Sequence, residues 1–366
     1  MYQPLPEGIR SARADNRNGL DIHYLEAGDA DAPVLLLLHG FPELSYSWRK
    51  VMLPLAEAGY RVIAPDQRGY GFTTGWDGDY DGDLGACRMF NLATDMVGLL
   101  HALKTGPVRA VVGHDFGSPV AAHCALIRPD LFRAAVLMSA PYGGPPPLRR
   151  RVPASDIHAD LAALPRPRKH YQRYYASRAA AADMLHAPQG LQAFFRAYYH
   201  VKSADWPENR PFELGGWRAA ELAKMPTYYI MDRDRDMAET VAPHMPSDEE
   251  VEACRWLPGE EMAVYARAFR QTGFQCALNW YRCMTDPALS PEMRAFAGAR
   301  IAVPATFIAG AQDWGIHQVP GALKAMAETA TADWRGTHLI EGAGHWVQQE
   351  QPAETVRLLL DFLKGL

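Results

Sequence analysis

Long apolar runs are absent from the sequence. A membrane-spanning helix needs roughly 20 consecutive apolar residues, whereas a run such as "VLLLL" at residues 34–38 has the length of a buried strand. The first residues, "MYQPLPEGIRSARADNRNG", contain no apolar core of a secretory signal. We therefore expect a cytoplasmic protein without a membrane span.

An excess of positive charge is also absent. The 366 residues carry a formal net charge of -5 at pH 7, which offers no electrostatic footprint for nucleic acid or an anionic membrane. Cysteine is scarce: the five cysteines are odd in number, scattered, and not in pairs spaced for zinc or redox chemistry. They are Cys87, Cys124, Cys254, Cys276 and Cys283. We expect reduced thiols packed as small apolar groups, no nucleic-acid partner and no metal site.

Strand signals of the buried type dominate the first 140 residues. Short runs rich in Val, Ile and Leu alternate there with helical patterns such as the one at residues 91–103. Two more strand signals, at 303–310 and 337–345, precede an amphipathic helix at the C-terminus. Continuous apolar strands between helices are typical of a mainly parallel sheet with helices on both faces. The sequence therefore predicts an α/β protein.

A segment of different character interrupts these strand signals. From about residue 141 to about residue 298 the chain is dense in Tyr, Trp, Phe and Met and shows helical patterning. An insertion of ~150 residues is about the size of a domain, and because it returns to the same sheet it should lie over that sheet as a lid. We predict a core of residues 1–141 and 298–366 and a mainly helical lid of residues 142–297.

Three residues that could do chemistry follow strand signals. Asp115 stands in "GHDFG", where the nucleophile motif G-x-S-x-G of serine hydrolases has its serine. Asp313 follows the signal at 303–310, and His345 comes on a loop at the end of the last one. Each has a simpler explanation alone: a helix cap, a turn residue and a surface-loop histidine. Their order is that of the α/β-hydrolase triad, and carboxyl ends of parallel strands share one edge of a sheet, so we expect one site.

Four motifs carry a resemblance to a known family. They are "HGFPE" (39–43), "PDQRGYG" (65–71), "GHDFGS" (113–118) and "GHWVQQEQP" (344–352). Together they resemble the α/β-hydrolase-fold epoxide hydrolases, whose relatives include the haloalkane and fluoroacetate dehalogenases. The resemblance implies an α/β-hydrolase fold with Asp115 as nucleophile. It also implies an oxyanion hole made by the backbone N–H groups of Phe41 and Phe116.

The same resemblance implies two tyrosine acids in the lid. "HYQRYYAS" (170–177) and "LNWYRCM" (278–284) are similar to the family segments that carry them, and point to Tyr171 and Tyr281. A tyrosine keeps its proton at pH 7 and can give it to a developing alkoxide. Because the chain has 16 tyrosines, packing as an amphipathic aromatic is the alternative for either one. The resemblance further implies substrate contacts from His39, Pro42, Trp280 and Trp346.

With an aspartate nucleophile, the epoxide hydrolase reaction that the resemblance implies has two steps. A carboxylate with an unperturbed pKa of ~3.9 is ionised at neutral pH and can attack saturated carbon directly. The product is an alkyl ester of Asp115, which water activated by His345, with Asp313 as its orienting acid, would hydrolyse. We expect a vicinal diol as product, a small-molecule epoxide that is bulky or apolar as substrate, and no metal or organic cofactor.

Two alternative functions stay open. A dehalogenase would displace a halide, but haloalkane and fluoroacetate enzymes have tryptophan or arginine directly after the nucleophile, and Phe116 has no side-chain donor. A biosynthetic or ligand-binding relative would keep the fold with a different or lost reaction, although binding alone gives no reason for a nucleophile, an acid and a base at three strand ends. The oligomeric state is also open, with a homodimer as one option.

An acidic run at residues 77–83, "DGDYDGD", is similar to the opening of an EF-hand calcium loop. The twelfth position, where that loop has a bidentate glutamate, is Arg88, and no helix pair obviously flanks the run. We interpret it as an acidic solvated loop and leave cation binding open.

Overall fold

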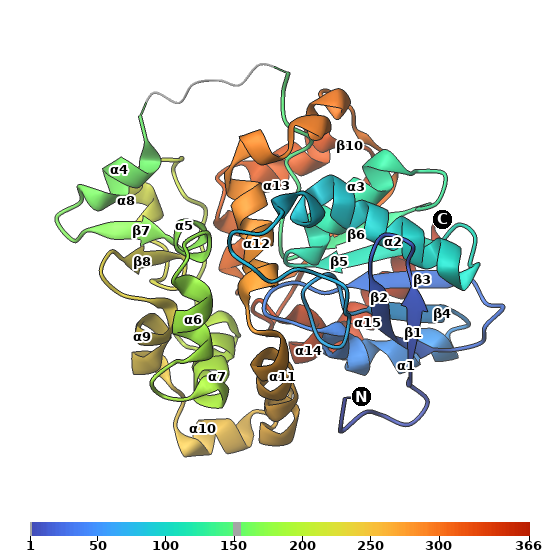
Figure 1. The fold of residues 1–366 in the computed structure, drawn as a ribbon, viewed down its shortest axis with the longest axis horizontal. Helices are drawn as coiled ribbons and strands as arrows, with labels where there is room; N and C mark the ends of the chain where they lie inside the picture. Colours follow the sequence, from blue (N-terminus) through green and yellow to red (C-terminus); the bar gives the residue numbers. More distant parts are fainter. Residues whose placement is uncertain (1, 149–154) are drawn as a thin grey trace.

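A central eight-stranded sheet organises the computed structural model, which describes residues 2–148 and 155–366 (Figure 1). The strand order is β1-β2-β4-β3-β5-β6-β9-β10. The pairs β1–β2 and β2–β4 are antiparallel and the other pairs are parallel. The strands are β1 (Arg10–Asp15), β2 (Asp21–Ala27), β3 (Val34–Leu38), β4 (Arg61–Pro65), β5 (Ala110–His114), β6 (Ala135–Met138), β9 (Ile301–Gly310) and β10 (Thr331–Ile340). The predicted α/β fold with a mainly parallel sheet is confirmed.

Helices cover both faces of this sheet. The pair α2 and α3 packs on one face, and the pair α1 and α15 packs on the other (Figure 1). Strands β3, β5 and β6 are buried along their whole length, which explains why they read as continuous apolar runs. The core helices are α1 (Arg49–Glu57), α2 (Met89–Leu103), α3 (Gly117–Ile127), α13 (Ala322–Ala325), α14 (Val347–Glu350) and α15 (Pro352–Lys364).

The chain leaves the sheet after β6 and returns to it at β9, with a mainly helical insertion between. We call its described residues, 155–297, the lid; it lies at one end of the sheet (Figure 1). Its helices are α4 (Ile157–Ala162), α5 (Tyr171–Tyr175), α6 (Ala180–Leu185), α7 (Leu191–Lys202), α8 (Ala219–Leu222), α9 (Met237–Val241), α10 (Asp248–Ala253), α11 (Gly259–Thr272) and α12 (Gln275–Thr285). The division into domains at residues 141 and 298 stays a prediction.

Three strands were not predicted from the sequence. In β1 each residue is exposed or half-buried, so this edge strand has no apolar pattern from which it could be predicted. The strands β7 (Arg168–His170) and β8 (Ile230–Asp232) form a two-stranded antiparallel sheet inside the lid. Each is three residues long, and they pair across about sixty residues of chain, as in Arg168 with Asp232. Such pairing depends on tertiary contacts and leaves no local signal.

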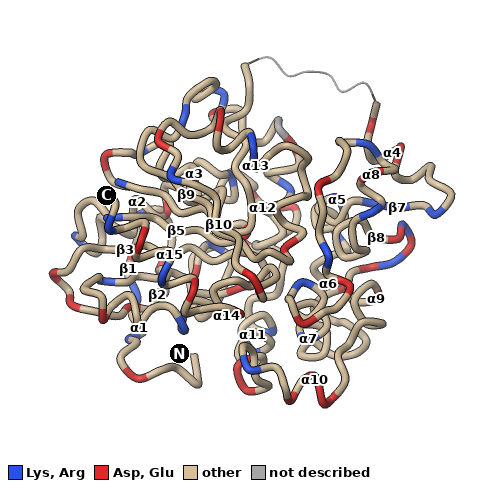
Figure 2. The backbone as a smooth tube through the Cα atoms, turned by 180° about the vertical axis from the view of Figure 1, so that it is seen from behind, with Lys and Arg blue, Asp and Glu red and all other residues tan. Residues whose placement is uncertain are grey.

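Charged residues of both signs are interspersed over core and lid. Figure 2 shows Lys and Arg beside Asp and Glu along most segments, so the described part of the chain presents no extended face of one sign in that view. Among the described residues, none of the helices is long and apolar enough to cross a membrane.

Candidate active site

The turn between β5 and α3 holds Asp115 in a left-handed backbone conformation, with φ at 50°. Glycines allow the close approach that this turn requires. A Cβ on Gly117 would lie 2.2 Å from the carbonyl oxygen of Leu38, and one on Gly40 would lie 2.4 Å from the Cβ of Asp115. The N-cap residue of α3 is Phe116, and this helix end has no side-chain cap. The carboxylate of Asp115 therefore does not serve as a helix cap.

The structure brings Asp115, His345 and Asp313 together. Asp115 Oδ1 accepts a hydrogen bond from the backbone N–H of Phe41 at 2.8 Å, and Oδ2 lies 3.2 Å from Nε2 of His345. On the other side of the imidazole, Nδ1 lies 3.1 Å from Oδ1 of Asp313. Asp313 also accepts from the backbone N–H of Gly315 at 2.6 Å, so the turn role and the contact with His345 coexist. All three side chains come from loops at the carboxyl ends of strands, as expected.

The electrostatic interactions among these three residues favour ionised Asp115, protonated His345 and ionised Asp313. Burial alone would lower the pKa of His345, but the adjacent Asp313, with the hydrogen bond to Asp115, raises it to about 9. Burial alone would raise the pKa of Asp115, yet the hydrogen bond and charge of His345 hold it well below its usual range. The pKa of Asp313 is likewise lowered by His345 against the effect of burial. Asp115 is therefore an ionised carboxylate at neutral pH.

Lys202 is a buried cation beside this group that the sequence did not reveal. It is the last residue of α7, and its ammonium nitrogen lies 4.9 Å from the ring centre of Tyr229 and 5.1 Å from that of Tyr198. Such contacts stabilise a desolvated cation. Its backbone carbonyl accepts a hydrogen bond from the N–H of His345 at 2.8 Å. The lid thus contacts the histidine loop directly.

The charge of Lys202 affects both neighbours. Burial lowers the pKa of this lysine, and the carboxylates of Asp115 and Asp313 oppose that effect. In return, Lys202 lowers the pKa of Asp115 and of His345. The lysine therefore favours a carboxylate and a neutral imidazole. No sequence signal marked it, because its contacts depend on how α7 docks on the core.

A second buried pair, Glu43 and His114, contacts the loops that carry Gly40 and His345. The ring nitrogen Nδ1 of His114 lies 2.5 Å from a carboxylate oxygen of Glu43, and Nε2 donates to the carbonyl oxygen of His345 at 2.7 Å. Glu43 also accepts from the backbone N–H of Gly40 at 3.1 Å. Burial alone would raise the pKa of Glu43, but His114 lowers it. Both residues stand in the motifs "HGFPE" and "GHDFGS", which could have drawn attention to them.

A cavity of about 190 Å³ opens beside Asp115. Both lid tyrosines that the sequence singled out line it, and their ring centres lie 6.2 Å apart. Burial, and next the charge of Asp115, raises the pKa of Tyr171 and of Tyr281, so both phenols are protonated at neutral pH. The other lining residues are Phe116, Pro119, Ala140, Pro141, Gln172, Met284, Gly315, Gln318, Val319 and Ala322.

Phe116 presents hydrocarbon to this cavity. Its ring contacts Tyr281 edge-on, with the ring centres 4.9 Å apart, and Trp280 at 5.3 Å. Its backbone N–H lies at the start of α3, directly after Asp115, and its part in an oxyanion hole stays a prediction. Of the two expected backbone donors, Phe41 already contacts Asp115.

Neither Pro42 nor Trp346 is among the residues that line this cavity, and their expected substrate contacts stay predictions. Both hold the lid residue Tyr199. The carbonyl oxygen of Pro42 accepts from the Tyr199 hydroxyl at 3.1 Å, and Trp346 donates from its indole N–H to the Tyr199 carbonyl at 2.8 Å. The rings of Trp346 and Tyr199 stack with their centres 4.0 Å apart. These two residues fasten α7 to the core.

The substrate contacts expected of His39 and Trp280 also stay predictions. Neither residue lines the cavity, and both pack against Tyr70, at ring-centre distances of 4.7 and 5.3 Å. Nε2 of His39 accepts from the backbone N–H of Gln67 at 3.1 Å, so the imidazole braces its own loop. His39 and Trp280 thus pack beneath the loops that carry the site.

The acidic loop at residues 77–83 is not simply solvated. Its residues contact the lid through hydrogen bonds and charge, as with Asp81 and Arg178.

Within residues 2–148 and 155–366, we find no group of three or more His, Cys, Asp or Glu side chains arranged to hold a metal ion.

Comparisons with known proteins agree with this architecture. Residues 33–352 match the family model described as alpha/beta hydrolase fold. Epoxide hydrolase A of Mycobacterium tuberculosis is 33% identical over 98% of this chain and 99% of its own length. An epoxide hydrolase of Caballeronia sordidicola is 30% identical over 95% of this chain and 92% of its own.

Solved structures show the same likeness. The epoxide hydrolase from an endophytic Streptomyces superposes with a TM-score of 0.78 at 31% identity, covering 98% of this chain and 96% of that one. Epoxide hydrolase I of potato (Solanum tuberosum) gives 0.75 at 30% identity, covering 98% and 100%. The similarity thus extends over core and lid together.

Proposed function

The chain belongs to the α/β-hydrolase fold family and is homologous over its full length to epoxide hydrolases, and on this premise we propose that it hydrolyses epoxides to vicinal diols. One observation supports the proposal most: an ionised carboxylate, Asp115, lies in a cavity lined by two protonated tyrosines and contacts a histidine on its far side. This arrangement supplies a nucleophile, two acids and a base around one reacting group.

In the first step, a carboxylate oxygen of Asp115 attacks an epoxide carbon and the carbon–oxygen bond of the ring breaks. Tyr171 and Tyr281 hydrogen-bond to the departing oxygen, and one phenol transfers its proton to it. The products are a hydroxyalkyl ester of Asp115 and a tyrosinate. Because burial raises the pKa of both phenols, the tyrosinate recovers a proton readily.

In the second step, water attacks the ester carbonyl carbon of Asp115. Esterification has removed the carboxylate charge that helped to hold the His345 proton, so the pKa of His345 falls and its proton can return to the tyrosinate. Neutral His345 then takes a proton from the water, and the N–H of Phe41 stabilises the oxyanion. When the tetrahedral intermediate collapses, the departing alkoxide takes the proton of the new carboxyl group, which releases the diol and regenerates the Asp115 carboxylate beside the His345 imidazolium.

A screen of purified protein against epoxides and haloalkanes tests this reaction class. We expect diol from styrene oxide or from a bulkier apolar epoxide, and no halide release from small haloalkanes. Halide release without diol would favour a dehalogenase, which the hydrocarbon surface of Phe116 argues against. Tight binding of a small molecule with no turnover of any epoxide would favour a ligand-binding function.

The cavities support an epoxide with an apolar arm as substrate. The cavity at Asp115 is small, and a second, mainly apolar cavity of about 370 Å³ shares Met284 with it. The two share walls: α12 carries Tyr281 and Met284, and α3 carries Pro119 beside the first cavity and His123 beside the second. An arm too large for the first cavity would extend past Met284 into the second.

Replacing Met284 with tryptophan should therefore select by substrate size. We expect the ratio of kcat/KM for a long-armed epoxide to that for styrene oxide to fall by roughly 10-fold or more, since a larger side chain at the shared position would obstruct an arm that extends from one cavity to the other. Met245→Trp is the matched control, because Met245 is exposed and lines neither cavity. An unchanged ratio in Met284→Trp would contradict this path for the arm.

Lys202→Met should shift the pH dependence of ester hydrolysis upward. Hydrolysis requires neutral His345, and the positive charge of Lys202 lowers the pKa of that histidine. Without the charge the pKa rises, so the ascending limb of the hydrolysis rate should move to higher pH, by roughly one unit. Single-turnover rates measured across pH check this, and a shift to lower pH would contradict it.

A further inference from the structure

The acidic loop, residues 77–83, joins two lid helices that are far apart in sequence. On one side, the hydroxyl of Tyr80 donates to the carbonyl oxygen of Ala176, at the end of α5, at 3.2 Å. On the other side, the Arg282 guanidinium of α12 donates to the backbone carbonyl oxygen of Tyr80. Asn279, also on α12, donates to the carbonyl oxygen of Asp79 at 3.3 Å. One short segment of the core therefore contacts both helices.

Charge reinforces these contacts. Arg178 lies two residues after Ala176, the C-cap residue of α5. It donates two hydrogen bonds to the carboxylate of Asp81, one of them at 2.9 Å. The guanidinium carbon of Arg178 lies 4.2 Å from the centre of the Tyr80 ring, and that of Arg282 lies 3.7 Å from it. The Arg178–Asp81 pair is largely exposed and would stabilise little alone. With two cation–π contacts on one ring it becomes part of a network.

The two helices are those that carry the tyrosine acids. Tyr171 is the first residue of α5, a helix of only five residues, and Tyr281 lies in α12. We propose that the acidic loop, with Tyr80 at its centre, positions Tyr171 and Tyr281 relative to each other for ring opening. This rests on the proposed function in one respect, namely that the two tyrosines act on the same oxygen.

Positioning matters because both phenols must reach one epoxide oxygen while Asp115 attacks the neighbouring carbon. A helix as short as α5 has little rigidity of its own and depends on tertiary contacts. The triad does not use the acidic loop: Asp115, Asp313 and His345 stand on core loops. Loosening the loop should therefore slow formation of the ester and spare its hydrolysis.

Tyr80→Ala tests this separation in the full-length protein. Single-turnover measurements with an epoxide, followed by mass analysis of the Asp115 peptide, give the rates of ester formation and ester hydrolysis separately. We expect formation to slow by between roughly 10- and 100-fold, since misplacement by about 1 Å can cost that much. We expect hydrolysis to stay close to the wild-type rate. Equal slowing of both steps, or of neither, would overturn the proposal.

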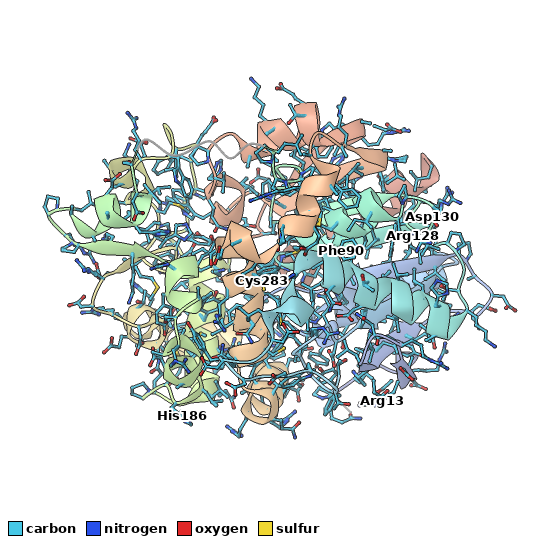
Figure 3. The ribbon with its side chains drawn as sticks, turned by 45° about the horizontal axis from the view of Figure 1, so that its top comes forward. Arg13, Phe90, Arg128, Asp130, His186 and Cys283 are labelled. Atoms are coloured by element: carbon cyan, nitrogen blue, oxygen red, sulfur yellow. The ribbon has the colours of Figure 1, made fainter. Side chains whose placement is uncertain are left out.

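Exchanging the charges of Arg178 and Asp81 tests whether their ion pair contributes to the positioning. Arg178→Asp should slow ester formation, and adding Asp81→Arg should restore much of it, because the opposite charges face each other again. Arg128→Asp is the matched control: Arg128 forms a similar exposed, two-bonded pair with Asp130 on the core, away from the lid (Figure 3). It should leave both rates unchanged. Failure of the charge exchange to rescue would count against the ion pair.

A readout independent of turnover separates this proposal from the proposed function. In Tyr80→Ala, backbone amides of α5 and α12 should exchange with deuterium faster than in the wild type, while those of α3 should not change. If no epoxide alkylates the wild type, the proposed function fails, yet this exchange result still decides whether the loop holds the helices. Unchanged exchange in α5 and α12 would overturn the positioning role.

Discussion

Asp115→Ala is expected to abolish diol formation. A methyl group cannot attack the epoxide, and no other carboxylate lines the cavity among the described residues. Removing the nucleophile of an enzyme that works through a covalent intermediate lowers kcat by a factor on the order of 10⁴ or more. Steady-state diol formation from the best epoxide of the screen measures the loss. Turnover at the wild-type rate would remove Asp115 from the mechanism.

The alanine variant needs a control for folding, because it leaves His345 and Lys202 as buried cations with one fewer counter-charge. Thermal unfolding and circular dichroism would show whether the fold persists. A second measurement uses the wild type alone: repeated turnover in ¹⁸O water should place ¹⁸O in the Asp115 side chain, because water attacks that carbonyl carbon. If the ¹⁸O label appears in the diol already in the first turnover and never in Asp115, an ester on Asp115 is contradicted.

The sequence could predict that Asp115, Asp313 and His345 lie together because each comes at the end of a strand signal. The strand order then brings the ends of β5, β9 and β10 toward one edge, where Asp115, Asp313 and His345 meet. Tyr171 and Tyr281 came from a resemblance, since nothing local distinguishes them from other lid tyrosines. Their place in the cavity agrees with that prediction, and their chemical role is still a proposal.

Lys202 and the contacts of the acidic loop could not be predicted in this way. Both depend on how the lid docks on the core, which joins residues far apart in the sequence, such as Tyr80 with Ala176 and Lys202 with His345. Trp346 shows a different limit, because it contacts the lid while its substrate contact stays a prediction. A motif marks the residues that hold a loop in place as well as those that touch substrate, and only tertiary contacts distinguish the two.

His345→Gln is expected to stop the reaction at the covalent intermediate. Glutamine cannot take a proton from water, so hydrolysis of the ester should slow by roughly 10²- to 10⁴-fold. Asp115 would stay ionised without the imidazolium, because the N–H of Phe41 and the charge of Lys202 still favour the carboxylate. Ester formation should therefore continue, and the ester should accumulate.

Mass spectrometry of the digested variant after exposure to an epoxide identifies the trapped species. The peptide that contains Asp115 should gain the full mass of the epoxide, because ring opening adds the molecule without loss of atoms. His186→Gln, the same substitution at an exposed lid histidine, should turn over normally and show no adduct (Figure 3). The double variant with Asp115→Ala should also show none, since it lacks the oxygen that forms the ester. An adduct on another peptide, or wild-type diol formation by His345→Gln, would show that the chemistry runs through a different group.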